Sequence, residues 1–165
     1  AHVAAHEGLN AVAAIRGEEV HALDYTAMPR ATYTRPQIAS IGRTQAECER
    51  DGIPVKVGKV PFQAIGKAII HGEHGGFAKV IAHAETDAIL GVHLIGSHVT
   101  ELIAEASAAM LFEATAWEIG ATVHPHPTLS ETVMEFYKSS APKRARSPRR
   151  RSSRWPPTFT VPIVM

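Results

Sequence analysis

The sequence predicts an α+β fold, a two-layer sandwich in which an antiparallel sheet carries helices on one face. Extended segments are grouped along the chain instead of alternating with helices, which disfavours a parallel βαβ arrangement. Residues 77–84 alternate in polarity, and a turn at 85–87 separates them from a second extended run at 89–95, which is typical of a hairpin. Residues 98–114 place apolar side chains at the i, i+3, i+4 spacing of a helix with one buried face. A nucleotide-binding Rossmann unit is not predicted, because no GxGxxG motif occurs.

Capping and chain-breaking residues set the bounds of the other predicted elements. Gly17 is a stop signal for the first helix, and Pro36 interrupts a pair of short strands. Thr44 and Glu47 have the spacing of a capping box, and Gly52 ends the helix that they begin. The predicted helices cover residues 1–17, 45–51, 98–114, 117–120 and 129–137, and the predicted strands cover 31–34, 38–41, 55–62, 67–71, 77–84 and 89–95.

The charge is divided unevenly between the body of the chain and its end. Residues 141–165 hold seven of the 17 basic side chains and no acid, which leaves ten basic against 16 acidic side chains in 1–140. The last 25 residues are also rich in Pro and Ser and have no periodicity, so we expect a disordered basic tail that is foreign to the fold. Nucleic acid is therefore not an expected partner, except through this tail.

The composition points to a reduced protein inside the cell. Cys48 is the one cysteine in the sequence, which excludes an internal disulfide and a zinc site built from several cysteines. No apolar run reaches the length of a membrane helix, and the N-terminus does not read as a signal peptide. We therefore predict a cytoplasmic protein without a membrane partner. The chain does not begin with Met, and we expect residue 1 not to be a natural start.

The segment around His126 is the strongest candidate for chemistry among the ten histidines. Pro125 and Pro127 stiffen the backbone on either side of it, and Glu131 follows five residues later. One interpretation of Glu131 is structural, as the partner of Thr128 in a capping box. The other is that its carboxylate orients the imidazole of His126 and stabilises the protonated ring, as general acid–base catalysis requires. We predict no metal site, because His-Pro-His and the His2 and His6 pair each lack a third ligand.

The residues of this segment resemble a family signature, and other segments agree with it. HPHPTLSE is similar to the HAHPTLSE ending of dihydrolipoamide dehydrogenases, within the flavin-dependent disulfide oxidoreductases. ATYTRPQIASIGRTQAE resembles VVYTDPEVASVGLTEEQ, and VKVGKVPFQAIGKA resembles VKVGKFPFAANGRA. TDAILGVHLIGSHVTELIAEASAAM resembles TDRILGVHIVGPHAGELIAEAVLAM, and AHVAAHEG resembles LAHxAxxEG. The resemblance covers residues 1–138 in one order.

The resemblance implies a C-terminal dimerisation domain over 23–140, preceded by a remnant of an FAD domain over 1–22. It implies that His126 takes the proton of a substrate thiol, that Glu131 orients it, and that the His126–Pro127 bond is cis. It also implies that Ala1, His2, His126 and Pro127 lie against the flavin of a homodimeric parent enzyme. That parent would use FAD and NAD and serve a 2-oxo acid dehydrogenase complex. We expect neither cofactor to bind this chain stably by itself.

Departures from the family pattern keep other interpretations open. The redox-active CxxxxC pair and the glycine-rich cofactor motifs are absent, so we expect the chain to be inactive alone. It is alternatively a stand-alone dimerisation or scaffold module, or part of a glutathione or mercuric reductase-type enzyme. A third interpretation is a nucleic-acid-associated protein acting through the basic tail. The sequence leaves the disulfide substrate open.

Overall fold

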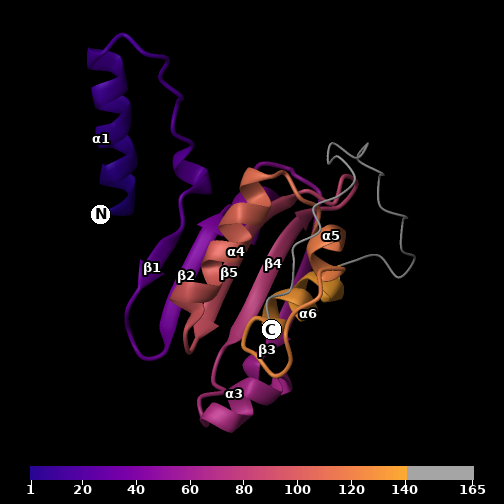
Figure 1. The fold of residues 1–165 in the computed structure, drawn as a ribbon. Helices are drawn as coiled ribbons and strands as arrows, with labels where there is room; N and C mark the ends of the chain where they lie inside the picture. Colours follow the sequence, from indigo (N-terminus) through magenta and orange to yellow (C-terminus); the bar gives the residue numbers. More distant parts are fainter. Residues whose placement is uncertain (141–165) are drawn as a thin grey trace, which may run out of the picture.

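The computed structural model describes residues 1–140, and the predicted basic tail 141–165 lies outside the described residues. Figure 1 shows one sheet with helices packed against it and an N-terminal helix that stands to one side. The elements in chain order are α1 (His2–Ile15), η1 (Tyr25–Ala27), β1 (Arg30–Thr32), β2 (Gln37–Gly42), α2 (Gln45–Arg50), β3 (Val55–Pro61), η2 (Phe62–Ala64), α3 (Gly66–His71), β4 (Phe77–His83), β5 (Ile89–Gly96), α4 (Val99–Leu111), α5 (Ala116–Gly120) and α6 (Glu131–Ser140).

The sheet has five strands in the order β1-β2-β5-β4-β3, and every neighbouring pair is antiparallel. The predicted hairpin forms between β4 and β5, where Val80 is opposite Val92. Strand β5 is central, because its other edge pairs with β2 and places Leu94 opposite Ala39. The predicted α+β class with an antiparallel sheet is therefore confirmed.

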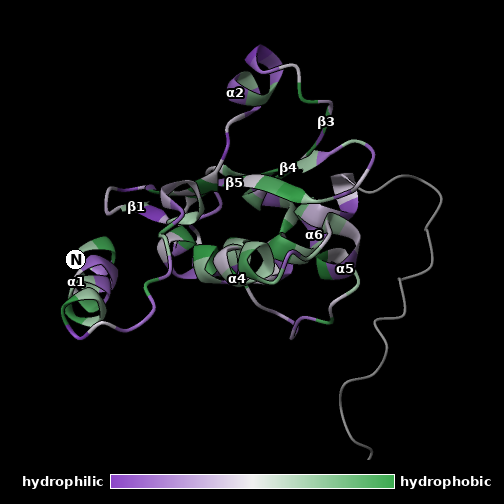
Figure 2. Ribbon diagram, turned by 90° about the horizontal axis from the view of Figure 1, so that it is seen from above, coloured by the Kyte–Doolittle hydropathy of each residue, from purple (hydrophilic) through white to green (hydrophobic). Residues whose placement is uncertain are grey.

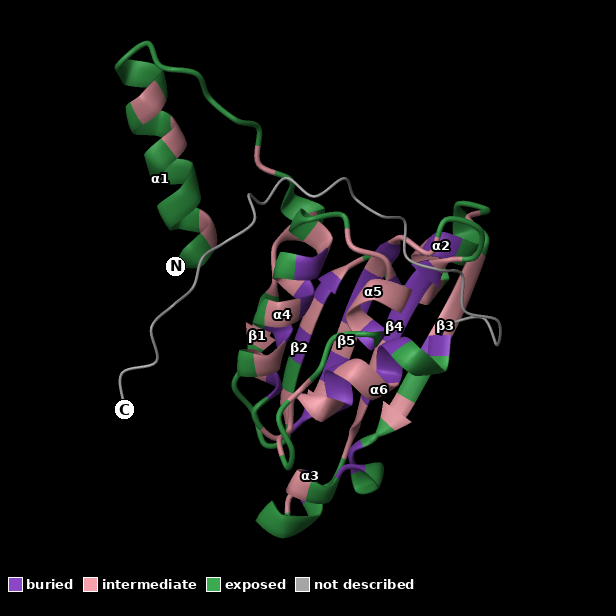
Figure 3. Cartoon of the chain, turned by 45° about the vertical axis from the view of Figure 1, so that its right-hand side comes forward, coloured by how far each residue is buried: buried purple, intermediate pink, exposed green. Residues whose placement is uncertain are grey.

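The main core lies between the sheet and the helices α4, α5 and α6. Helix α4 buries one stripe, which includes Val99, Ile103 and Ala106. This stripe follows the 3.6-residue period of an amphipathic helix. Helix α6 packs mainly on β3 and β4, and it brings Phe136 and Tyr137 into the same cluster. Figure 3 shows these three helices over one face of the sheet, with buried residues between the two layers.

The opposite face of the sheet is partly covered by helix α2, which Figure 2 shows on the other side of the sheet from α4. Cys48 and Ile81 are both completely buried, although neither belongs to the main core. Lys79 on the sheet donates a hydrogen bond of 2.7 Å to the Gln45 side chain of α2. The Thr44–Glu47 capping box that begins this helix is formed as predicted. The helices that build the main core are thus on one face, with α2 added on the other.

The strand predicted over residues 67–71 is wrong, because this segment is the helix α3. Its apolar residues do not alternate, since Ala68 is buried while Ile69 and Ile70 are both exposed. Gly72 ends the helix in the left-handed conformation, with φ of 70°, which a residue without Cβ adopts readily. A short apolar run with two β-branched residues has no period long enough to distinguish a strand from a single helical turn.

Helix α1 forms as predicted but contributes no buried residue. Three side-chain contacts connect it to the following segment: His2 Nε2 to the Pro29 carbonyl oxygen, Asn10 to the His21 carbonyl oxygen, and Tyr25 to Glu7. Figure 3 shows it apart from the sheet and exposed along its length. Within residues 1–140, no helix is long and apolar enough to cross a bilayer.

Candidate acid–base site

The candidate site is the loop between α5 and α6, which runs from Ala121 to Ser130. Two hydroxyl groups, linked in series, make hydrogen bonds within this loop. The Thr128 hydroxyl donates to the Pro125 carbonyl oxygen at 2.7 Å, and this leaves the Thr128 oxygen free to accept from the Ser130 hydroxyl at 2.8 Å. The His126–Pro127 peptide bond is cis, as the family resemblance implied. These contacts and the two prolines hold the loop in one conformation in front of α6.

Glu131, the first residue of α6, uses its two carboxylate oxygens for two different partners. Oε1 lies 2.9 Å from Nδ1 of His126, and Oε2 accepts a hydrogen bond of 2.9 Å from the backbone N–H of Thr128. Glu131 therefore makes a contact that a capping box requires and also a contact with the imidazole of His126. The predicted capping box is only half formed, because the Thr128 hydroxyl is directed to Pro125 instead of to the first backbone N–H groups of the helix.

The surroundings of Glu131 keep its carboxyl group ionised. The backbone N–H of Thr128 contributes most to holding its pKa below the usual value, followed by the hydrogen bond with His126. Partial burial opposes this shift, while the positive charges of His126 and His124 add to it. A carboxylate that stays negative can fix the orientation of a neighbouring imidazole and stabilise its protonated form.

The imidazole of His126 is held on one side and open on the other. Its side chain is 78% exposed, whereas that of Glu131 is 18% exposed. Its Nδ1 faces Glu131, and its Nε2 makes no hydrogen bond with any residue that the structure describes. This arrangement leaves Nε2 able to take a proton from a bound group and to return it.

A second histidine–carboxylate pair lies behind this loop, and sequence reasoning did not find it. Nε2 of His124 is 2.9 Å from Oε1 of Glu105 on α4, and its side chain is only 5% exposed. The two residues are 19 positions apart and belong to different elements. The one available signal for His124 was its place as the first histidine of the His-Pro-His motif. For Glu105 the sequence offered no signal beyond its place on a helix.

The residues predicted to face a flavin are not brought together within this chain. Ala1 precedes α1 and His2 begins it, beside β1 at one edge of the sheet. His126 and Pro127 precede α6, which covers β3 and β4 at the other edge (Figure 1). Ala1 and His2 are exposed, and no side chain caps the first turn of α1.

No group of three or more His, Cys, Asp or Glu side chains in residues 1–140 is arranged to hold a metal ion. The thiol of Cys48 is buried under α2, and this burial raises its pKa. It is therefore poorly suited to act as a nucleophile.

Comparison with known protein families supports the resemblance seen in the sequence. Residues 28–137 match the model of the family described as pyridine nucleotide-disulphide oxidoreductase, dimerisation domain. The chain is 53% identical over 135 residues to dihydrolipoyl dehydrogenase of Bacillus subtilis, covering 82% of this chain and 28% of the relative. It is 42% identical over 135 residues to the mitochondrial dihydrolipoyl dehydrogenase of Caenorhabditis elegans, covering 82% of this chain and 27% of that relative.

Solved structures with the same fold include LpdA from Mycobacterium tuberculosis and the HOCl-induced flavoprotein disulfide reductase RclA from Escherichia coli. The match to LpdA has a TM-score of 0.72 and 23% sequence identity, and it covers 78% of this chain and 28% of the LpdA chain. The match to RclA has a TM-score of 0.73 and 21% sequence identity, and it covers 78% of this chain and 30% of the RclA chain. The chain thus spans less than a third of the length of the relatives that it matches. It belongs to the dimerisation-domain family of the pyridine nucleotide-disulphide oxidoreductases.

Proposed function

We propose that the chain is the C-terminal part of a flavin-dependent dihydrolipoamide:NAD oxidoreductase and supplies its homodimer interface and its acid–base pair. In this proposal, residues 1–22 are the end of an FAD domain, 23–140 form the interface domain, and 141–165 are foreign to the fold. The observation that carries it is the contact of 2.9 Å between His126 Nδ1 and Glu131, which leaves Nε2 open to solvent. The similarity to dihydrolipoyl dehydrogenases favours the lipoamide substrate.

The proposed reaction begins with the transfer of a proton from a substrate thiol to Nε2 of His126. The resulting thiolate attacks one sulfur of a redox-active disulfide, and the S–S bond breaks so that the other sulfur leaves as a thiolate. Glu131 stabilises the imidazolium that forms on His126 and keeps Nδ1 as the protonated nitrogen. Cys48 is buried and is the one cysteine in the sequence, so the disulfide has to come from elsewhere, and we assign it to the partner subunit.

The remaining parts of the proposal concern cofactors and partners. Bound FAD would carry electrons from the reduced disulfide to NAD. Backbone groups of Ala1 and His2 and the loop residues His126 and Pro127 would contact it. This chain alone would bind neither FAD nor NAD stably and would be inactive. We place the parent enzyme in the cytoplasm, in association with a 2-oxo acid dehydrogenase complex.

A chimeric enzyme tests the proposal. The chain replaces the matching segment of the Bacillus subtilis dihydrolipoyl dehydrogenase, which supplies the parts that this chain lacks. We expect the chimera to oxidise dihydrolipoamide with NAD, and His126→Gln to lower kcat by about 100- to 10,000-fold, the usual contribution of a positioned acid–base group. Steady-state kinetics measure this loss.

The control is His74→Gln, because His74 is exposed on the loop between α3 and β4 and should leave kcat unchanged. A chimera that dimerises and retains FAD, but in which His126→Gln is as active as the parent chimera, would contradict the acid–base role. The chain would then be a dimerisation module without a catalytic residue.

A further inference from the structure

The partly buried pair of His124 and Glu105 lies behind the loop of the proposed acid–base residue and has no part in the reaction described above. From Ala121 to Pro127 every residue is exposed except His124. Val123 is 91% exposed and the His126 side chain 78%, whereas the His124 side chain is 5% exposed. This one side chain therefore anchors the outer half of the loop to the body of the domain.

The anchor consists of two contacts on opposite sides of one ring. Nε2 of His124 is 2.9 Å from Glu105 Oε1 on α4, and Nδ1 is 3.1 Å from the Thr122 carbonyl oxygen. The two contacts fix the orientation of the ring between the loop backbone and α4. The His124 side chain is buried, while that of Glu105 is 33% exposed.

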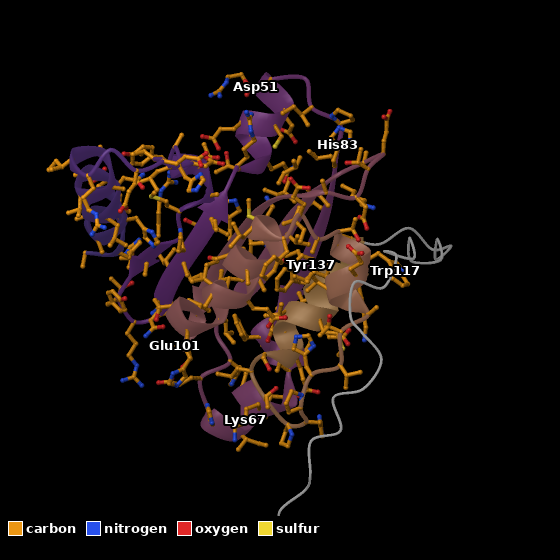
Figure 4. All side chains as sticks on the ribbon, turned by 45° about the horizontal axis from the view of Figure 1, so that its top comes forward. Asp51, Lys67, His83, Glu101, Trp117 and Tyr137 are labelled. Carbon is orange, nitrogen blue, oxygen red and sulfur yellow. The ribbon has the colours of Figure 1, made fainter. Side chains whose placement is uncertain are left out.

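Electrostatic effects also link this pair to its neighbours. The hydrogen bonds from Thr128 and His126 contribute most to the lowered pKa of Glu131, and the electrostatic effect of His124 is the smallest contribution. On the other side, the negative charge of Glu105 helps burial to raise the pKa of the Tyr137 hydroxyl on α6. Figure 4 shows Tyr137 in the packed layer, and Glu101 well away from it at the start of α4.

We propose that His124 is a positioning residue for His126, because the contact of His124 with Glu105 fixes the loop to α4. The proposal rests on the proposed function for the role of His126, but its geometric part stands separately. If the anchor is lost, Pro125 and His126 gain freedom to move, and the contact between His126 and Glu131 is no longer enforced. His126 would then populate orientations in which Nδ1 does not face the carboxylate.

The test is the protonation pattern of the His126 ring in the 15N-labelled 165-residue chain, read from its imidazole nitrogen and carbon resonances. Above the pH at which the ring loses its charge, we expect the native chain to keep the remaining proton on Nδ1, facing Glu131. In His124→Gln and in Glu105→Gln, the form protonated at Nε2 should appear beside it. Glu105→Gln preserves the size of the side chain, so it tests the pair with little change in packing.

The matched control is Glu101→Gln, which removes the same charge from an exposed position one helical turn earlier on α4. It should leave the His126 resonances unchanged. The double variant of His124 and Glu105 should show no more loss than either single variant, because the two residues act as one unit. The proposal is overturned if His126 keeps its proton on Nδ1 in both single variants while the backbone spectrum of the sheet stays native.

Kinetics of the chimeric enzyme add a second readout. We expect Glu105→Gln to lower kcat on the order of ten-fold while KM for NAD stays the same, since supporting residues around a reactive group typically have effects of this size. An inactive native chimera would overturn the proposed function but leave the spectroscopic result standing. An active chimera with an unchanged kcat in Glu105→Gln would instead overturn the positioning role in the reaction.

Discussion

At the scale of single residues, two buried hydroxyl groups on α6, those of Thr132 and Tyr137, lack a hydrogen-bond partner among the residues that the structure describes. The hydroxyl group of Tyr137 makes no hydrogen bond with any residue that the structure describes, although the whole side chain is buried. Its ring stacks against Phe136, with centroids 4.4 Å apart. A buried hydroxyl without a partner costs stability, and the aromatic ring itself supplies the packing.

We therefore expect Tyr137→Phe to raise the free energy of unfolding by up to about 1 kcal/mol at neutral pH. Its effect should grow above pH 10. The Tyr137 pKa is raised from 10.0 in the folded chain, because burial and Glu105 disfavour the phenolate. The tyrosine ionises at lower pH in the unfolded chain than in the folded one. The contribution of Tyr137 to the free energy of unfolding is therefore constant below about pH 10, and it falls by about 1.4 kcal/mol per pH unit between the unfolded and the folded pKa.

Denaturant unfolding monitored by circular dichroism at pH 7 and above pH 10 checks both parts. Tyr33→Phe is the control, because Tyr33 is 80% exposed and its loss should change neither value. A Tyr137→Phe variant that is less stable than the native chain at pH 7 would show that the hydroxyl has a partner in solution.

The residues of the site differ in how far the sequence could reveal them. His126 and Glu131 are five positions apart in a loop that prolines stiffen, so local spacing was enough to pair them. Glu105 is paired with His124 only after α4 and α6 have packed on the same face of the sheet. No periodicity along the chain encodes that contact, because it depends on where two helices lie in space.

At the scale of elements, the position of α6 depends on a close approach to β3 at Gly58. A Cβ atom added there would lie 2.3 Å from the Phe136 carbonyl oxygen and 2.5 Å from the Ser139 hydroxyl oxygen. Both of these atoms belong to α6, the helix that begins with Glu131. The absence of a side chain at Gly58 therefore lets the helix that carries the acid–base pair pack directly on the sheet.

We predict that Gly58→Ala pushes α6 away from β3 and lowers the free energy of unfolding by about 1–3 kcal/mol, as overpacking does in other cores. Thermal or denaturant unfolding of the chain measures the loss. Gly66→Ala is the matched control, because an added Cβ at Gly66 meets no atom within 4 Å. Equal stabilities of the two variants would show that β3 and α6 separate at little cost.

The elements also show where sequence patterns fail. Alternation identified the β4–β5 hairpin, and the long amphipathic stripe identified α4, because both patterns repeat several times. Helix α3 has six residues and less than two full turns, so its apolar residues resembled a strand. Helix α2 has its capping box in the sequence, but its place on the second face depends on the burial of Cys48 and Ile81.

At the scale of the whole molecule, several large apolar side chains are exposed to solvent. Leu9, Val12 and Ile15 project from α1, and Leu111 at the end of α4 is 77% exposed. Exposed apolar groups of this size commonly mark surfaces that another chain covers. The family to which the chain belongs is named for dimerisation and its model matches residues 28–137, so we expect a second copy to cover Leu111, whereas α1 lies outside the matched residues.

We expect the chain to self-associate at micromolar concentration, through residues 23–140. Removal of residues 1–22 should preserve the dimer, whereas Leu111→Lys should weaken it about ten-fold or more, since it loses the burial of one leucine side chain. Sedimentation velocity over a range of concentrations measures both effects. A native chain that sediments as a monomer throughout this range would contradict the prediction.

The central place of β5 in the sheet has a consequence for the order in which the chain can fold. Strands β1 and β2 pair with each other, and so do β3 and β4, but the two pairs are connected only through β5. During synthesis, two separate strand pairs therefore emerge first, and the inner edge of each, β2 or β4, waits for β5. The sheet closes only when Ile89–Gly96 arrives and joins segments that are far apart in the chain. Such distant contacts slow folding, so the ribosome has to complete more than half of this chain before its core can form.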